Sequence, residues 1–198
     1  DIHVFFSGHR GYHVHVENEA IKSVDAVARK EIADYICGFG FDVAFHGLFG
    51  KDSDSRYRFK GLSADEMGWD GRIARGVRKF ILNAEQEDYK AMGLRSNAIL
   101  VLTKNKEKIL KYCDQGYWGA IQGVGFETWK KIVDLCVSSE SAKIDTVVTT
   151  DVHRLIRLTD SLHSKTGFKK VEFAISSIED FDPLKSAVAF ESGAARVF

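Results

Sequence analysis

Two short runs near the start of the chain constrain the fold most, because they predict a β-hairpin around a glycine-rich turn. Residues 2–6 (IHVFF) and 13–16 (HVHV) are rich in β-branched and aromatic side chains, which favour strands. The link between them, residues 7–12 (SGHRGY), contains two glycines. Glycine permits positive φ and lets a ligand approach the backbone closely, so this turn is suited to hold an anion.

The polar side chains of the turn have the chemistry of a phosphate-binding site. Ser7 offers a hydroxyl donor, Arg10 can form paired hydrogen bonds with phosphate oxygens, and His13 begins the returning strand. A surface hairpin without a ligand is the alternative. A further alternative is a metal-dependent hydrolase built on His13 and His15, which strand alternation places on one face, although the sequence shows no third ligand.

A second stretch, residues 145–168, concentrates acidic, basic and imidazole groups. Residues 145–150 (DTVVTT) alternate β-branched side chains and predict a strand. Asp151 stands where a helix N-cap is expected. A short helix after it would place Arg154 and Arg157 on one face, because residues three apart are neighbours on a helix surface.

The end of this stretch adds His163 and Lys165 shortly before Gly167. With Asp145 and the two arginines they form a set of one carboxylate followed by four potential cations, which is what a nucleoside triphosphate site requires. The acid can hold a metal ion, and the cations neutralise phosphate oxygens. Each residue alone also fits an ordinary structural role, as an ion pair, a solvated helix face or a buried histidine.

The region between the two stretches is mainly helical in pattern. A helix is predicted from residue 17 or 18 to Gly38, with an apolar stripe facing the core, and residues 39–49 predict a strand or edge segment. From Ser63, where Ser63-x-x-Glu66 resembles a capping box, to residue 138 the pattern stays helical, except that residues 98–102 fit a strand equally well.

The remaining segments complete an α+β prediction. Residues 170–176 alternate as a half-buried strand, and Pro183 is expected to end regular structure. Strands at both ends with helices between them predict an α+β or α/β core formed by residues 1–62 and 139–198, interrupted by a helical insert over residues 63–138. Asp52-x-Asp54 lies in a polar run and is predicted to be a solvated loop rather than a metal site.

Composition excludes several classes of protein. Lys plus Arg equals Asp plus Glu at 28 each, so net charge gives no argument for nucleic-acid binding. The three cysteines are far apart and form no CxxC pair, which indicates buried thiols in a reducing compartment rather than disulfides or a zinc site. No apolar run approaches the ~20 residues of a membrane span, and no signal peptide is visible.

The two stretches together resemble a known family. SGHRGYHVHV and VTTDVHRLIRLTDSLHSKTGF are similar to two motif regions of the small, catalytic subunit of archaeal-eukaryotic DNA primase, in the family's order and separated by a helical region. The resemblance implies template-directed synthesis of short RNA primers from NTPs on single-stranded DNA, by two-metal nucleotidyl transfer. It implies that Asp145 is a catalytic carboxylate that binds Mg²⁺ or Mn²⁺. It also implies nucleotide binding by Ser7, Gly8, His9, Arg10, His13, Arg154, Arg157, His163 and Lys165.

The family adds expectations about fold, partners and location. It implies a small mixed β-sheet flanked by helices with an inserted helical subdomain, a primase large subunit and a single-stranded DNA template as partners, and no membrane. The location would be the cytoplasm or nucleoid in an archaeon and the nucleus in a eukaryote. A primase-polymerase of the same superfamily that acts in repair, or a non-catalytic nucleotide-binding module, is the alternative.

Two departures from the family's pattern affect the expected activity. The family's pair of acids before the SGHRGYH-like motif and its zinc knuckle, which holds structural Zn²⁺, have no counterpart in this sequence. The chain lacks an initiator Met and opens inside an apparent strand, so we expect a fragment of a longer protein. With only one of three metal-binding acids, the chain alone is expected to be inactive.

Overall fold

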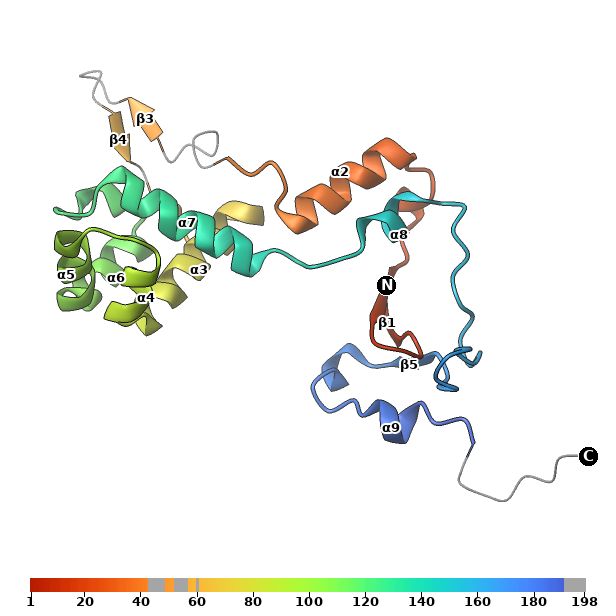
Figure 1. Ribbon diagram of the computed structural model, residues 1–198. Helices are drawn as coiled ribbons and strands as arrows, with labels where there is room; N and C mark the ends of the chain where they lie inside the picture. The colour runs from red at the N-terminus through yellow and green to blue at the C-terminus, as the bar shows by residue number, and fades with distance from the viewer. Residues whose placement is uncertain (43–48, 52–56, 60, 191–198) are drawn as a thin grey trace, which may run out of the picture. The chain divides into compact units, whose positions relative to one another are not determined.

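The chain forms two compact units in a computed structural model that describes residues 1–42, 49–51, 57–59 and 61–190. One unit combines Asp1–Arg29 with the described part of Val147–Phe198, and the other is formed by the described part of Lys30–Thr146 (Figure 1). The first unit contains a small β-sheet and the second contains most of the helices. The predicted α+β class is therefore confirmed, and the expected division into a catalytic core and a helical insert stays a prediction.

The sheet of the first unit has three strands in the order β2-β1-β5. Strands β1 (Ile2–Phe6) and β2 (Tyr12–Val16) form the predicted hairpin, and β5 (Val171–Phe173) pairs with the other edge of β1. Both pairings are antiparallel, so these described strands form an antiparallel sheet where a mixed one was expected. The pairings place Phe5 opposite both His13 and Glu172.

The two faces of this sheet differ in chemistry. Because residues paired across antiparallel strands point to the same face, the register gathers His3, Phe5, His13, His15 and Glu172 on one face. We call this the imidazole face. On the opposite, aromatic face, Phe6 packs near Tyr12, Phe168 and Phe181, and Phe173 stacks on Phe181 with ring centroids 4.2 Å apart.

The segment after β5 covers the aromatic face and departs from prediction in two places. The expected strand over residues 170–176 is only Val171–Phe173, because the chain turns into the 3₁₀-helix η2 (Ile175–Ser177). Pro183 was expected to end regular structure, but it opens the short helix α9 (Pro183–Ser186). Proline is well suited to the first helical position, where its missing N–H costs no hydrogen bond, and the Asp182 carboxylate accepts a hydrogen bond from the Leu184 amide at 2.9 Å.

The predicted helix over residues 17–38 is two helices, α1 (Glu19–Lys22) and α2 (Ala26–Cys37). Asn18 caps the first, as predicted, by accepting a hydrogen bond from the Ala20 amide at 2.8 Å. The predicted core stripe is wrong in part: Ile32 is 40% exposed, whereas Ala33 and Cys37 are buried. The buried positions of α2, Ala33 and Cys37, lie one residue beyond Ile32 and Ile36, so the helix buries a stripe next to the predicted one.

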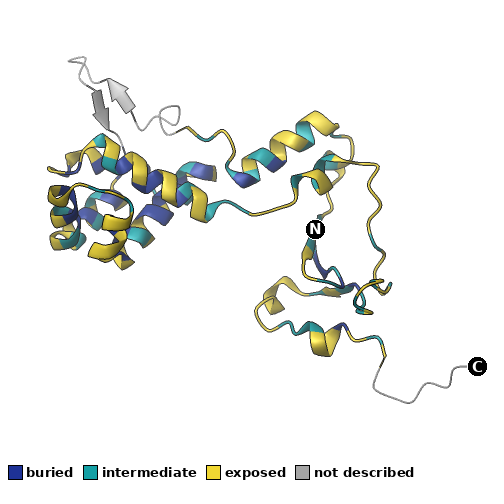
Figure 2. Ribbon diagram, viewed as in Figure 1, coloured by how far each residue is buried: buried dark blue, intermediate teal, exposed yellow. Residues whose placement is uncertain are grey.

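The second unit is a bundle of helices, as predicted for residues 63–138. Its elements are α3 (Gly68–Asn83), α4 (Gln86–Ala91), α5 (Ser96–Lys104), α6 (Lys106–Asp114), the 3₁₀-helix η1 (Trp118–Ala120) and α7 (Phe126–Glu140). Residues 98–102, left undecided between strand and helix, lie in α5. Figure 2 shows the buried residues of this unit on the facing sides of its helices.

The core of the helical unit is built around two tryptophans. Trp118 and Trp129 are fully buried and their ring centroids lie 5.2 Å apart. Around them Ile73, Val77 and Ile81 of α3 and Ile132, Val133 and Cys136 of α7 are buried, and Phe80 of α3 is partly buried. All three cysteines are free and buried, and burial raises the pKa of the Cys113 and Cys136 thiols to about 12.

One expectation for the residues before α3 is corrected. The capping box at Ser63 and Glu66 does not start a helix, because α3 begins at Gly68 after Met67. Three arginines of α3 make contacts within the chain. The Arg72 guanidinium lies over the Trp69 ring, Arg75 donates to the Ala64 carbonyl at 2.6 Å, and Arg78 pairs with Asp114 at 2.8 Å.

A short antiparallel pair, β3 (Phe49–Lys51) and β4 (Tyr57–Phe59), belongs to the same unit. Most of the strand expected over residues 39–49, and the Asp52-x-Asp54 sequence, lie outside the described residues. Within the part of the chain that the structure describes, no helix is long and apolar enough to cross a membrane.

The segment 145–157 differs most from its prediction. The expected strand is the helix α8 (Thr146–Thr150), and the helix expected after Asp151 is absent from that described segment. The Asp151 carboxylate instead accepts a hydrogen bond from the His153 amide at 3.0 Å, which closes a turn. Arg154 and Arg157 therefore do not share a helix face. β-Branched residues favour a strand where another strand can pair with them, and no described strand pairs with this run.

Candidate functional site

The glycine-rich turn between β1 and β2 is organised by Ser7. Its amide donates to the Gly11 carbonyl at 2.9 Å, and its Oγ accepts hydrogen bonds from the His9 amide at 3.3 Å and the Gly11 amide at 3.2 Å. The hydroxyl can still donate its own proton, because both of these contacts use its oxygen as an acceptor. Ser7 therefore shapes the turn and keeps one donor for a ligand.

The loop formed by residues 163–168 packs directly on this turn. The Thr166 hydroxyl donates to the Gly8 carbonyl, and the His163 amide donates to the Phe168 carbonyl at 2.8 Å. Gly8 has a φ of +84°, and a Cβ there would lie 3.0 Å from the His163 Cβ and 3.1 Å from the Phe168 oxygen. Only glycine allows both this conformation and this approach, so the two stretches that the sequence singles out meet at Gly8.

Two histidines stack where the turn and the loop meet. The His9 and His163 rings are 4.9 Å apart and nearly parallel, at 8°. Nδ1 of His163 accepts a hydrogen bond from the Lys165 amide at 3.2 Å, so a neutral His163 carries its proton on Nε2 as a free donor. Burial, and then the nearby Arg157, His9 and Lys165, lower the pKa of His163.

Two cations beside this stack have no partner within the described residues. Arg10 lies in the turn and Lys165 in the facing loop, and both side chains are exposed. Neither makes an ion pair or a side-chain hydrogen bond with another described residue. Unpaired cations on either side of a glycine-rich turn are available for an anionic ligand.

Arg157 is held in the same unit through its backbone and its side chain. Its guanidinium donates to the Leu162 carbonyl at 2.7 Å, and its own carbonyl accepts a hydrogen bond from the Lys170 ammonium at 2.9 Å. Lys170 is only 2% exposed, and its Nζ lies 4.4 Å from the centre of the Phe5 ring. The sequence prediction missed Lys170. Its position two residues before Glu172 was the available signal, because alternation places both on the imidazole face.

His13 and His15 lie next to each other on the imidazole face, with ring centroids 6.4 Å apart. His13 Nδ1 and His15 Nε2 are buried and have no hydrogen-bond partner. Burial, followed by the charge of Lys170, lowers the pKa of both side chains. Among the described residues, no group of three or more His, Cys, Asp or Glu side chains could hold a metal ion, so the structure supplies no third ligand for this pair.

The structure thus places most of the predicted nucleotide-binding residues in one unit. These residues are Ser7, Gly8, His9, Arg10, His13, Arg157, His163 and Lys165. Arg154 belongs to the same unit and is exposed in the irregular segment after α8. Asp145, the predicted metal ligand, is exposed directly before α8 and belongs to the other unit.

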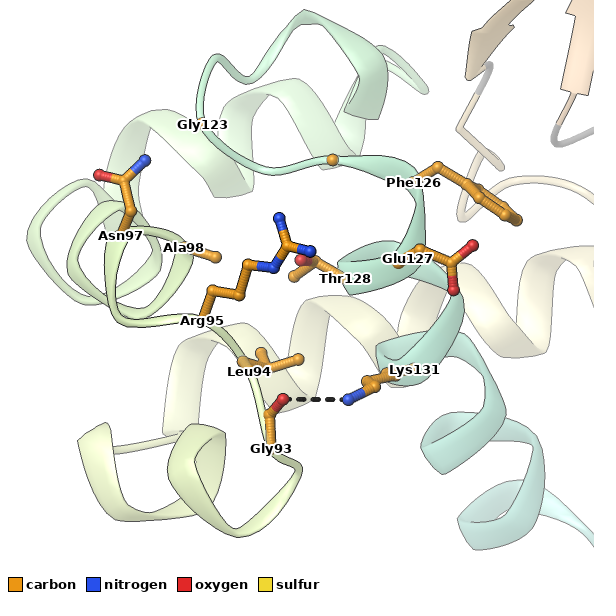
Figure 3. Close-up of a pocket in the computed structure, with 11 residues that line it drawn as sticks. Gly93, Leu94, Arg95, Asn97, Ala98, Gly123, Phe126, Glu127, Thr128 and Lys131 are labelled. Carbon is orange, nitrogen blue, oxygen red and sulfur yellow. Dashed lines mark hydrogen bonds between the residues drawn. The ribbon is translucent and has the colours of Figure 1, made fainter.

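The helical unit has a pocket of its own that the sequence did not indicate. It has a volume of about 530 Å³ and lies between the starts of α5 and α7 (Figure 3). Lys131 spans it by donating to the Gly93 carbonyl at 3.0 Å, and the Arg95 side chain extends into it from the start of α5. None of the residues in the turn or in the facing loop lines this pocket.

Comparison with known proteins shows the family of this chain. The family described as DNA primase small subunit matches residues 1–175. DNA primase small subunit PriS of Methanothrix thermoacetophila is 34% identical over 96% of this chain and 52% of that protein. The same-named proteins of Methanococcoides burtonii and Natronomonas pharaonis are each 32% identical, over 96% and 93% of this chain. The chain spans about half the length of these relatives. It therefore belongs to the DNA primase small-subunit family.

Proposed function

We propose that this chain carries the nucleoside-triphosphate-binding surface of a DNA primase, which makes short RNA primers from NTPs on a single-stranded DNA template. Family membership supports the reaction class. The observation that supports the residue assignment is the packing of the 163–168 loop on the glycine-rich turn at Gly8, where Arg10 and Lys165 have no partner among the described residues. Distant parts of the chain thereby present donors and cations within one unit.

The proposed roles follow from the charge of the ligand. A triphosphate carries several negative charges, and more charge accumulates on pyrophosphate as it leaves. Arg10 and Lys165 would bind its oxygens as cations, while Ser7 and the Nε2–H of His163 would donate neutral hydrogen bonds. Fixed donors of this kind stabilise the developing charge without having to reorganise during the reaction.

The proposal assigns one residue of this chain to metal binding. Asp145 is proposed as one of the carboxylates that would hold Mg²⁺ or Mn²⁺, an ion that would supply charge stabilisation for phosphoryl transfer in this reaction class. The described residues bring together no set of three metal-binding groups, so they do not form a complete site for such an ion. We accordingly propose that the chain alone does not synthesise primers, and template-directed synthesis with Mn²⁺ would contradict this.

Partners and location are likewise proposals. A primase large subunit and a single-stranded DNA template are the expected partners, and structural Zn²⁺ is a further expectation from the family. The family membership supports both partners, because a subunit described as small implies a larger one and primer synthesis requires a template. The relatives' source organisms support a location in the cytoplasm or nucleoid.

NTP binding tests the proposed site directly. Calorimetry of the chain with an NTP and Mg²⁺ should show binding that Arg10→Ala and Lys165→Ala each weaken by about 1–3 kcal/mol, the scale of a hydrogen bond to a charged group. Arg95→Ala is the matched control, because it removes an exposed arginine from the helical unit. Equal affinities for Arg10→Ala, Lys165→Ala and the unmodified chain would place the nucleotide elsewhere.

A further inference from the structure

The side chain of Lys170 is charged, almost fully buried and outside the set of residues assigned above. It is 2% exposed and is the one charged or polar residue that is buried among those described. Its ammonium makes one hydrogen bond, to the Arg157 carbonyl at 2.9 Å, and lies 4.4 Å from the centre of the Phe5 ring. Both contacts place the ammonium at the imidazole face of the sheet.

Burying this ammonium costs hydration free energy, which suggests that the residue has a function that an apolar side chain could not supply. An ammonium loses much of its hydration when buried, and one carbonyl with one aromatic ring replaces only part of it. The acid on the same face, Glu172, is 2.7 Å from Nδ1 of His3 and forms no ion pair with Lys170 in the described structure. Burial lowers the pKa of Lys170, while Glu172 opposes that shift. An apolar side chain such as Met would avoid this cost.

We propose that Lys170 is a positioning residue of the triphosphate site: it ties the backbone of Arg157 to the imidazole face and supplies a fixed positive charge beside His13 and His15. This inference rests on the proposed function and extends it to a buried residue. The hydrogen bond from Lys170 holds the backbone of Arg157, and the Arg157 guanidinium in turn donates a hydrogen bond to the Leu162 carbonyl. Lys170 thereby orders the segment that leads into the 163–168 loop.

The charge matters because it acts on the two histidines from within the protein. Lys170 is the largest electrostatic influence on both, after burial. The other charged or titratable groups that face them are Arg157 for His13, Glu17, His3 and Glu172 for His15, and each histidine for its pair. The charge of Lys170 adds to the effect of burial in lowering the pKa of both imidazoles, and it supplies positive charge for an anion from a buried residue in a fixed position.

The first test uses the free chain and needs no nucleotide. Lys170→Met removes the charge and the tie, Lys170→Gln removes the charge but keeps an N–H donor, and Lys169→Met removes the neighbouring charge as the control. NMR titration should show the His13 and His15 midpoints moving to higher pH in both Lys170 variants and unchanged in Lys169→Met. Hydrogen exchange at residues 157–162 should accelerate in Lys170→Met and less in Lys170→Gln.

The second test measures nucleotide affinity with Mg²⁺ present. Loss of a fixed charge should weaken binding of an NTP about tenfold in both Lys170 variants, and weaken binding of the matching monophosphate less, since the electrostatic attraction scales with ligand charge. A purely structural role would weaken both ligands alike. Lys169→Met should bind as the unmodified chain does. Lys170→Arg, which keeps the charge and a donor, should recover most of the lost NTP affinity.

The outcomes separate this inference from the proposed function. If Arg10→Ala and Lys165→Ala weaken NTP binding while both Lys170 variants bind normally, the nucleotide site stands and the role of Lys170 is wrong. If the unmodified chain binds no NTP, the proposed site fails, and the NMR titration still decides whether Lys170 acts on the two histidines. Should Lys170→Met not fold, Lys170→Gln carries the same comparison, and unchanged histidine midpoints in it would overturn the inference.

Discussion

At the scale of single residues, the contact between the turn and the loop depends on Gly8. We predict that Gly8→Ala destabilises the chain by about 1–3 kcal/mol, because an alanine there combines an unfavourable positive φ with overpacking. Its Cβ would lie 3.0 Å from the His163 Cβ and 3.1 Å from a backbone oxygen. Chemical denaturation monitored by NMR signals of the sheet unit would measure the change.

Gly11 provides the matched control in the same turn. Its φ is not in the positive range, and an added Cβ would meet only the Ser7 Oγ, at an ordinary 3.9 Å. Gly11→Ala should therefore change the free energy of unfolding by no more than about 0.5 kcal/mol, as expected for a surface substitution. A similar loss of unfolding free energy in Gly8→Ala and Gly11→Ala would show that the 163–168 loop does not pack as closely on Gly8 as described.

The half-buried histidines His13 and His15 predict a dependence of stability on pH. The pKa of His13 and of His15 is lowered from the ordinary 6.5 in the folded chain, chiefly by burial and then by Lys170. Between the lowered pKa and 6.5 the unfolded chain binds more protons than the folded one. The free energy of unfolding should therefore fall as pH decreases below 6.5 and be insensitive to these groups above it.

Thermal unfolding between about pH 7.5 and about pH 5.5 would show this dependence while most carboxylates stay ionised. The double variant His13→Gln/His15→Gln should flatten the change in Tm across that window. His153→Gln, which alters an exposed histidine in the turn after Asp151, should leave it as it is. A double variant whose Tm varies with pH as in the unmodified chain would show that other groups cause the dependence.

Single residues also show how far the sequence could predict the site. Ser7, Arg10, His163 and Lys165 were found because glycines and clustered polar groups mark such loops, although their assigned roles stay predictions. Lys170 was missed because its significance lies in its burial and in its contact with the Arg157 carbonyl. A buried lysine and an exposed one look alike in a sequence, since burial is set by tertiary packing.

At the scale of secondary-structure elements, α3 contains a glycine that behaves unlike most glycines in helices. An alanine in place of an interior helical glycine usually adds about 1 kcal/mol of stability. At Gly71, however, an added Cβ would lie 1.8 Å from the Glu66 carbonyl oxygen, which is a backbone atom at the entry to the helix. We predict that Gly71→Ala lowers the free energy of unfolding by about 1–3 kcal/mol through overpacking.

The control for this prediction is Gly125→Ala, at the N-cap of α7. An added Cβ there meets no atom within 4 Å, and φ is −83°. Alanine is only a poorer N-cap than glycine, so the expected loss is below about 1 kcal/mol. Circular dichroism during urea unfolding would compare the two variants. If Gly71→Ala stabilised the chain instead, the Glu66 carbonyl would have to lie farther from Gly71 than the structure describes.

Elements also show which patterns predict well. The hairpin and helices α3 and α7 were predicted because long or strongly patterned segments bury one face in any fold of this class. The run Thr146–Thr150 was predicted wrongly because it is short and β-branched on every side, a pattern that fits a strand only when a partner strand is adjacent. The break between α1 and α2 was missed because no Gly or Pro marks it.

At the scale of the whole molecule, the two units are built differently along the chain. The helical unit is one continuous segment, and its core cluster runs from Leu62 to Cys136 around the two buried tryptophans. The sheet unit is assembled from two segments more than a hundred residues apart, joined by pairing between β1 and β5. Contacts within one segment cost less chain entropy to form than contacts between distant segments.

We therefore predict that residues 30–146, expressed alone, fold cooperatively with the helical content and tryptophan environment that they have in the full chain. The two segments of the sheet unit should not fold when residues 30–146 are replaced by a flexible linker too short to connect Arg29 to Val147. Tryptophan fluorescence and circular dichroism during thermal unfolding would test the first claim, with Trp129→Ala as a variant that should abolish the transition because the side chain is fully buried in the core. A gradual, non-cooperative change in residues 30–146 would show instead that the helical unit needs the sheet unit to fold.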